Sequence, residues 1–266
     1  SLPMQALLVD GLNLVRRIYA AVPSPPEDAD EAQRTTHIEG VIRSSTSSLE
    51  RALRFHQPSH CVAVFEQVGP TWRHRLYPDY KKNRSPMPTP LSESMNELKK
   101  AFEIKGVQNY DRAGYEADDV IATMATKIAI HHGTVTILST DRNYCQLLRP
   151  EISVYDHFGQ RHLDREMIQK RFGVEPEQLP FLLALAGDSG LSIPGIPSIG
   201  VRTAARLVHE YHTLDNLLEA SREMTGKIGS KLFNGQEIAR LGLRLFTLRK
   251  DIDLGINLNQ FRYQPD

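Results

Sequence analysis

The sequence predicts an α/β protein: a mostly parallel central sheet flanked by helices, followed by a helical region. Through about residue 150, apolar runs of strand length alternate with helical patterns, which is typical of βαβ units. Three of these runs lead into an acidic residue, namely 6–9 into Asp10, 61–65 into Glu66 and 135–138 into Asp141. Continuous apolar runs of this length indicate strands that are buried on both faces, as in a parallel sheet.

Strands and helices are predicted in this order along the chain. Strands are expected at 6–9, 61–65, around Val107 and from 134. Helices are expected after Asp10, at 38–55, 92–103 and 116–131, and then, where the alternation fades past residue 154, at 164–172, 176–186, 203–211 and 236–247. This change of pattern predicts a core domain at residues 1–173 and a helical domain at residues 174–263.

A proline-rich, basic segment at residues 69–91 interrupts the core. It is longer than an ordinary loop of a compact domain, so we expect a functional flap or arch at about residues 70–105. The segment interleaves cations with aromatic rings: Trp72, Arg73, Arg75, Tyr77, Tyr80, Lys81, Lys82 and Arg84. Cations bind phosphates and rings stack on bases, whereas the alternative is a solvated charged surface, which the interleaved rings disfavour.

The acids at the strand ends are expected to meet. Parallel strands bring their carboxyl ends to one edge of a sheet, where ligands bind. A fourth acidic group, made of Glu116, Asp118 and Asp119, opens the helix after the strand around Val107. Repulsion among so many carboxylates is tolerable mainly when divalent cations lie between them. Any one of these acids alone could instead cap a helix, but the four groups together favour a metal site.

Residues 193–205 predict a second functional element. Gly195 and Gly200 bracket a tight turn directly before a helix, so that backbone N–H groups and the helix dipole face an anion. This arrangement is typical of a helix-hairpin-helix, which holds a duplex by its phosphates without reading bases. An ordinary helix–helix turn is the alternative; Arg202 and Arg206, one helical turn apart, favour phosphate binding.

The composition limits the functional classes. The 32 basic and 32 acidic residues give a formal net charge of zero, so any binding of nucleic acid would depend on local patches. Cys61 and Cys145 make no disulfide framework, and there is no signal peptide or membrane-length apolar run, so we expect a cytoplasmic protein that uses no membrane. The sequence has no phosphate-binding glycine loop, nucleophile elbow or zinc-ligand spacing. We expect a monomer with no obligatory protein partner.

Six motifs, in order and spacing, resemble those of the 5′→3′ exonuclease and flap endonuclease superfamily over nearly the whole chain. They are 9–13 (VDGLN), 76–81 (LYPDYK), 116–123 (EADDVIAT), 139–141 (STD), 187–189 (GDS) and 193–196 (IPGI). Within this superfamily the chain is most similar to the bacterial exonuclease IX-like flap endonucleases. The resemblance implies a PIN-like nuclease core with a helical arch and a C-terminal helix-hairpin-helix module.

The resemblance also implies roles for individual residues. Mg²⁺, which Mn²⁺ can replace, would be bound by two groups of acids. The first group is Asp10, Glu66, Glu116, Asp118 and Asp119. What remains of the second group is Asp141 and Asp188. The predicted catalytic residues, three of which resemble those that hold the scissile phosphate, are Tyr80, Lys81, Arg84 and Asp118. Contacts to DNA are assigned to Arg73, Lys81, Lys82, Arg84, Ser198, Ile199, Gly200, Val201, Arg202 and Thr203. K⁺ would be bound by the backbone carbonyls of Leu185, Ala186, Pro194, Ile196 and Ile199.

The chain departs from the family pattern at several positions. Glu66 and Asn143 stand where aspartate is usual, and Leu191 stands where strongly active members have aspartate. Because Mg²⁺ prefers carboxylate oxygens, we expect the second metal site to be weakened. In the hairpin, Ser198 replaces a usual glycine and is expected to strain the turn slightly, while Arg202 replaces a usual lysine and keeps the charge.

The sequence therefore predicts a structure-specific nuclease that hydrolyses phosphodiesters in the 5′ flap of branched DNA. It would use Mg²⁺ at the carboxylates and K⁺ in the hairpin. The depleted second site supports an alternative, a branched-DNA-binding protein with weak or no catalysis. A PIN-like ribonuclease would share the acids, but the helix-hairpin-helix argues against it because that element holds DNA duplex.

Overall fold

The computed structural model describes residues 3–265, and its central sheet confirms the predicted α/β class. Six strands lie in the order β3-β2-β1-β4-β5-β6, and all pair in parallel except β6, which is antiparallel to β5. They are β1 (Gln5–Asp10), β2 (His60–Val64), β3 (Gln108–Tyr110), β4 (Thr134–Leu138), β5 (Ile152–Asp156) and β6 (Arg161–His162). Because β2 and β4 flank β1 in parallel, the carboxyl ends of all three strands lie at one edge.

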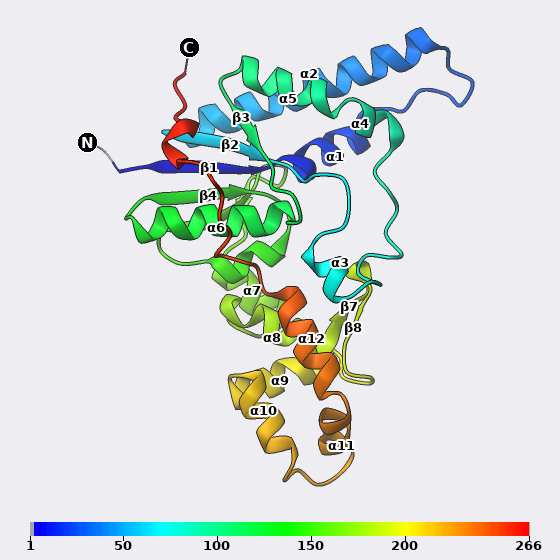
Figure 1. The fold of residues 1–266 in the computed structure, drawn as a ribbon, viewed down its shortest axis with the longest axis vertical. Coiled ribbons are helices and arrows are strands. Elements are labelled where there is room, and N and C mark those ends of the chain that lie inside the picture. The colour runs from blue at the N-terminus through cyan, green and yellow to red at the C-terminus, as the bar shows by residue number, and fades with distance from the viewer. Residues whose placement is uncertain (1–2, 266) are drawn as a thin grey trace.

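Helices cover both faces of this sheet (Figure 1). On one face lie α1 (Gly11–Ala21), α2 (Glu31–His56) and α5 (Met95–Ile104), and on the other lies α6 (Ala117–Ile130). Side chains alternate along β1, so Leu7 packs with the first group of helices and Leu8 packs with α6. Both leucines are almost fully buried, as expected for a strand in the middle of a parallel sheet.

The last two strands were not predicted from the sequence. In β5, Ile152, Val154 and Tyr155 are buried and the other two residues are half-buried, and the strand follows a short 3₁₀ helix, η1 (Arg142–Leu147), rather than a crossover helix of ordinary length. β6 has only two residues. Two residues carry no periodicity, and the side chains of β5 lack the strict alternation that identifies a half-buried strand.

The proline-rich segment leaves the sheet after β2 and projects toward the C-terminal region (Figure 1). It contains α3 (Trp72–Leu76), which lies beside a small two-stranded sheet, and it returns through α4 (Thr89–Glu93) to α5. The projecting part is shorter than the predicted arch, because α5 belongs to the core layer. Leu98 and Phe102 of α5 are fully buried.

The C-terminal region is helical, as predicted. Its helices are α7 (Arg165–Phe172), α8 (Leu179–Ala186), α9 (Val201–Tyr211), α10 (Leu214–Ser221), α11 (Lys227–Asn234) and α12 (Gln236–Phe246). α10 and α11 were not expected; each has only eight residues, about two turns. A two-stranded sheet, β7 (Gly187–Asp188) and β8 (Ile193–Pro194), joins α8 to the hairpin before α9.

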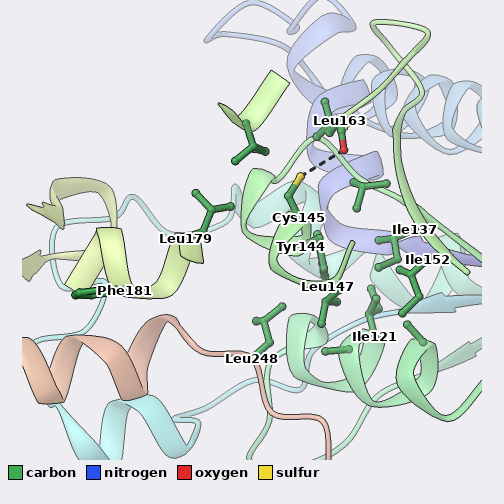
Figure 2. Packing of buried hydrophobic residues seen from close by; sticks show 14 of the residues in the cluster. Ile121, Ile137, Tyr144, Cys145, Leu147, Ile152, Leu163, Leu179, Phe181 and Leu248 are labelled. Carbon is green, nitrogen blue, oxygen red and sulfur yellow. Dashed lines mark hydrogen bonds between the residues drawn. The ribbon is translucent and has the colours of Figure 1, made fainter. Parts of the chain in front are cut away.

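One apolar core joins the sheet to the C-terminal helices. It contains residues of β4, α6, η1 and α8, together with Leu248 from the segment after α12. Figure 2 shows Leu248 beside Leu147, with Tyr144 and Ile121 gathered between η1 and α6. The C-terminal segment therefore contributes to the same core that positions the predicted site. Among the helices formed by residues 3–265, none combines the length and apolar character needed to cross a membrane.

Candidate active site

The predicted carboxylates do come together at the carboxyl edge of the sheet. Asp10 ends β1 and caps α1, Asp141 follows β4, and Glu66 follows β2. The Glu66 carboxylate accepts a hydrogen bond of 3.1 Å from the backbone N–H of Ala117, which places it at the start of α6. Asp118, in the first turn of α6, approaches Asp10 closely enough for one hydroxyl group to contact both. Acids from three strands and one helix therefore share one site.

That hydroxyl belongs to Tyr144, a residue that the sequence analysis missed. Its oxygen lies 3.1 Å from Oδ2 of Asp10 and 3.3 Å from Oδ1 of Asp118, and the side chain is fully buried. Ser139 also donates to Oδ2 of Asp10, at 2.9 Å. Ser139 belongs to a recognised motif and could have been found in the sequence. Tyr144 carries no such signal, because only the fold of η1 brings it under Asp10 and Asp118.

The surroundings of Asp10, Asp118 and Glu66 disfavour the ionised form of each carboxylate. Burial raises the pKa of Asp10 to about 7, and repulsion from Asp141 and Glu66 adds to this, although the hydrogen bond from Ser139 opposes it. Burial and repulsion from Asp141 hold the pKa of Asp118 well above its ordinary value. Burial and the charge of Glu116 raise the pKa of Glu66. This part of the site favours the binding of a cation.

Glu116 has a different environment, in which protein cations already compensate its charge. Arg73 donates to Oε1 at 2.6 Å, Lys81 donates to Oε2 at 2.5 Å, and the Tyr80 hydroxyl lies 3.0 Å from Oε1. Burial works to raise the pKa of Glu116, but Lys81 and Arg73 together lower it below its ordinary value. The carboxylate is therefore ionised and fixed in position.

Asp119 is fully buried, and four donors of the protein contact its carboxylate. Arg73 donates to both of its oxygens, at 2.7 and 3.0 Å, and the Trp72 indole N–H and the Arg249 backbone N–H donate as well, at 3.1 and 2.9 Å. Arg73 pairs with both oxygens of Asp119 but with only Oε1 of Glu116, so Asp119 is the acid whose oxygens are taken up by enclosed protein donors. The prediction that Asp119 binds the metal ion is therefore corrected: its carboxylate holds the guanidinium of Arg73 in place.

The predicted roles of two residues in the basic segment, Arg73 and Tyr80, are also corrected by the structure. Arg73 was predicted to contact DNA, but its side chain is 2 % exposed and lies inside the protein, so this prediction is wrong. Tyr80 is 5 % exposed, and its hydroxyl supports Glu116 rather than facing a phosphate. The other two rings are engaged within the protein as well: Trp72 bonds Asp119, and the Tyr77 hydroxyl donates to the carbonyl of Ser192. The rings of this segment therefore build the site instead of stacking on bases.

The remaining cations of the segment stay accessible. Lys82 and Arg84 are exposed, and the Lys81 side chain is 22 % exposed although its ammonium group contacts Glu116. The charges of Lys81 and Arg84 both lower the pKa of Asp141, so both lie near the acidic site. An anion that approaches the carboxylates would meet these two cations first.

The acidic site offers donors for a metal ion. Within residues 3–265, no three His, Cys, Asp or Glu side chains are arranged as a ready-formed metal site. The chemistry of the donors nevertheless fits a hard divalent cation, because Asp10, Asp118 and Asp141 are oxygen donors that no lysine or arginine of the described chain pairs with directly. Burial raises the pKa of all three acids, and repulsion from neighbouring carboxylates adds to this.

The second predicted group is depleted, as its sequence indicates. The amide oxygen of Asn143 accepts a hydrogen bond of 3.0 Å from Gln146. Leu191 packs in an apolar cluster with Tyr80 and Leu245, where no metal ligand is offered. Asp188 is half-buried. Desolvation by the surrounding protein raises the pKa of Asp141, and repulsion from Asp188 adds to this.

The predicted hairpin forms a turn directly before α9. Ser198 adopts the left-handed region, with φ of 68°. This confirms the expected strain at a position where glycine is usual. Gly200 caps α9, so the backbone N–H groups of the first turn, from Val201 onward, point out of the helix. Arg202 beside them is exposed.

The segments predicted to bind K⁺ lie side by side. Gly187 pairs with Pro194, and the backbone N–H of Ile196 donates to the carbonyl of Leu185 at 2.9 Å. A Cβ atom added to Gly195 would lie 2.3 Å from the carbonyl carbon of Ala186, so the two backbones are in direct contact. The fold thus gathers the carbonyl-bearing residues at one place.

Comparison with known families decides the classification of the chain. A model described as "5′-3′ exonuclease, N-terminal resolvase-like domain" matches residues 5–173, and one described as "5′-3′ exonuclease, C-terminal SAM fold" matches residues 174–266. The chain belongs to the 5′-3′ exonuclease family. This confirms the resemblance to the 5′→3′ exonuclease and flap endonuclease superfamily that the six sequence motifs indicated.

Relatives in this family cover nearly the whole chain. A protein named Flap endonuclease Xni from Shewanella frigidimarina is 42 % identical over 259 residues, which is 97 % of each chain. The Flap endonuclease Xni of Photorhabdus laumondii is 42 % identical over 258 residues, 96 % of each chain. Among solved structures, T5 5′-exonuclease with bound divalent metal ions (zinc) is 20 % identical with a TM-score of 0.77, covering 91 % of this chain and 89 % of that one. The catalytic core of Rad2 in complex with DNA substrate is 15 % identical with a TM-score of 0.59, covering 99 % and 83 %. These two share the fold.

Proposed function

We propose that this protein is a flap endonuclease that hydrolyses phosphodiesters in the 5′ flap of branched DNA. Its family makes it a nuclease, an enzyme that acts on phosphodiester bonds. The observation that carries the proposal is the group of acids, Asp10, Glu66, Asp118 and Asp141, with Lys81 and Arg84 beside it. Such a pairing of uncompensated acids with accessible cations suits a metal-dependent reaction on a phosphate.

The nuclease depends on divalent metal ions, and we propose Mg²⁺, replaceable by Mn²⁺, as the ion used. The first group of ligands would be Asp10, Glu66, Glu116 and Asp118, and Asp141 with Asp188 would form a weaker second group. When bound, the ion supplies Lewis acidity and a water of lowered pKa. Lys81 and Arg84 neutralise the negative charge that develops on the phosphate. Glu116 orients Lys81 for this role through their 2.5 Å contact.

The hairpin before α9 would hold the duplex next to the flap. The N–H groups after Gly200 and the exposed Arg202 offer donors and positive charge to a phosphate. We propose that K⁺ binds to backbone carbonyls between residues 185–186 and 194–199 and stabilises this element. Lys82 and Arg84 would bind the single strand, since both are exposed on the projecting segment.

We also propose two domains that meet after residue 173, the boundary at which one family model ends and the other begins. The buried free thiols of Cys61 and Cys145 suit the reducing conditions of a cytoplasm. Action as a monomer, without an obligatory protein partner, completes the proposal.

One alternative has a specific observation in its favour. Asn143 and Leu191 offer no carboxylate to the second site, so a branched-DNA-binding protein with weak or no catalysis would have the same structure. Labelled 5′-flap DNA incubated with Mg²⁺ or Mn²⁺ separates the two. We expect cleavage that Asp118→Ala abolishes. The matched control Asp215→Ala, at an exposed acid on α10, should cleave normally. Tight binding of the flap without any metal-dependent product would refute the nuclease and support the alternative.

A further inference from the structure

Arg73 is the only cation described among residues 3–265 that is both fully buried and bonded to two of the acids at the site. It lies on α3, at the base of the projecting segment. Arg73 was predicted to contact DNA, but its 2 % exposure excludes a phosphate contact. A buried guanidinium is retained only where its donors are satisfied, so its partners indicate its role.

The guanidinium of Arg73 joins three parts of the chain. Nη1 donates to Glu116 at 2.6 Å and to Asp119 at 2.7 Å, and Nη2 donates to Asp119 at 3.0 Å. Nε donates to the carbonyl of Leu245 at 2.7 Å, and Nη2 also lies 3.3 Å from the carbonyl of Thr247. Those carbonyls belong to the last turn of α12 and the residue after it, so one side chain connects α3, α6 and α12.

Two carboxylates and two backbone carbonyls surround a single fork of donors. Asp119 orients that fork, since it is itself held by the backbone N–H of Arg249, two residues beyond Thr247. Only a planar guanidinium can reach all four acceptors, because a lysine has its donors on one nitrogen. The arrangement fixes the position of Glu116 relative to α12, which packs against α8 and the hairpin region.

We propose that Arg73 is a positioning residue, which holds Glu116 in place for metal binding and ties that carboxylate to the helix that leads back from the duplex-binding module. The inference rests on the proposed function in one respect, that Glu116 lies in the metal-binding group. Lys81 is the more exposed partner of Glu116 and is free to turn to a phosphate, whereas Arg73 is enclosed and stays with the carboxylate.

Arg73→Lys tests the proposal, because it keeps the positive charge but replaces the planar guanidinium, with its donors on three nitrogens, by a single ammonium nitrogen. We expect Mn²⁺ binding, measured by calorimetry without DNA, to weaken by roughly 10-fold or more, the effect typical of residues that orient metal ligands. Cleavage of a 5′ flap should lose kcat by a similar factor with little change in KM. Arg165→Lys is the matched control, since Arg165 on α7 also pairs with two carboxylates, Glu175 and Glu177, and these are exposed and outside the acidic site.

A purely structural role predicts a different result. Arg73→Lys would then lower the midpoint of thermal unfolding while Mn²⁺ affinity and kcat stay at wild-type values, and this outcome would overturn the proposal. If Arg73→Lys does not fold, the double variant Arg73→Met with Asp119→Asn removes both buried charges and leaves an acceptor for the Arg249 N–H, although the Trp72 indole N–H loses its own. It should fold and show the same loss of Mn²⁺ affinity; wild-type affinity would refute the role. Wild-type protein that neither binds Mn²⁺ nor cleaves would instead refute the proposed function.

Discussion

Replacing Gly195 by alanine should disrupt the hairpin region by direct overlap of atoms. The added Cβ would lie 2.3 Å from the carbonyl carbon of Ala186, 2.4 Å from the carbonyl oxygen of Leu185 and 2.5 Å from the amide nitrogen of Gly187. All three are backbone atoms, so no side chain can rotate away. Overpacking costs about 1–3 kcal/mol in ordinary cores, and backbone overlap places this variant at the upper end, at about 3 kcal/mol. For a chain of this size the midpoint of thermal unfolding should fall by roughly 6–12 °C.

Gly200→Ala provides the matched control for this prediction. It lies five positions further along the same turn, with φ of −89° and no atom within 4 Å of an added Cβ, so its unfolding midpoint should stay near that of wild type. Binding of duplex DNA in potassium chloride and in sodium chloride adds a second measurement. Gly195→Ala should lose any preference for potassium, because the carbonyls of residues 185 and 186 move. Equal melting of the two variants would show that the backbones at Gly195 separate easily and would refute the argument.

Three further predictions concern the acidic site. Lys81→Met should leave Glu116 with one cation fewer and lower the kcat of flap cleavage by roughly 100-fold, measured in single-turnover assays. Leu191→Asp should raise the amount of Mn²⁺ bound in calorimetry by restoring an acid near Asp188, while the loss of apolar contacts lowers stability by about 1–3 kcal/mol in chemical denaturation. The pKa of Asp10 is raised to about 7, so between pH 4 and pH 7 the folded state binds more protons than the unfolded state, and without divalent metal stability should fall as pH rises. Asp10→Asn should flatten that dependence and raise the unfolding midpoint at pH 8, and an unchanged pH profile would contradict the burial argument.

The sequence by itself determined the features that depend on neighbours along the chain. Apolar runs of strand length followed by acids predicted the parallel sheet and the convergence of Asp10, Glu66 and Asp141, because parallel strands share one carboxyl edge. The glycines around Ser198 predicted the turn before α9 for the same local reason. The two residues of β6 carry no periodicity, and the buried residues of β5 do not alternate strictly, so both strands were missed, as were the helices α10 and α11.

The tertiary structure alone decided which side chains act at the site and which support it. Arg73 stands in a run of cations, and nothing within that run distinguishes it from Arg84. It is buried because the carbonyls of Leu245 and Thr247, more than 170 positions away, close over it. Tyr144 reaches Asp10 across 134 positions in the same way. Such contacts depend on how distant segments pack, and local patterns in a sequence record only what each segment does by itself.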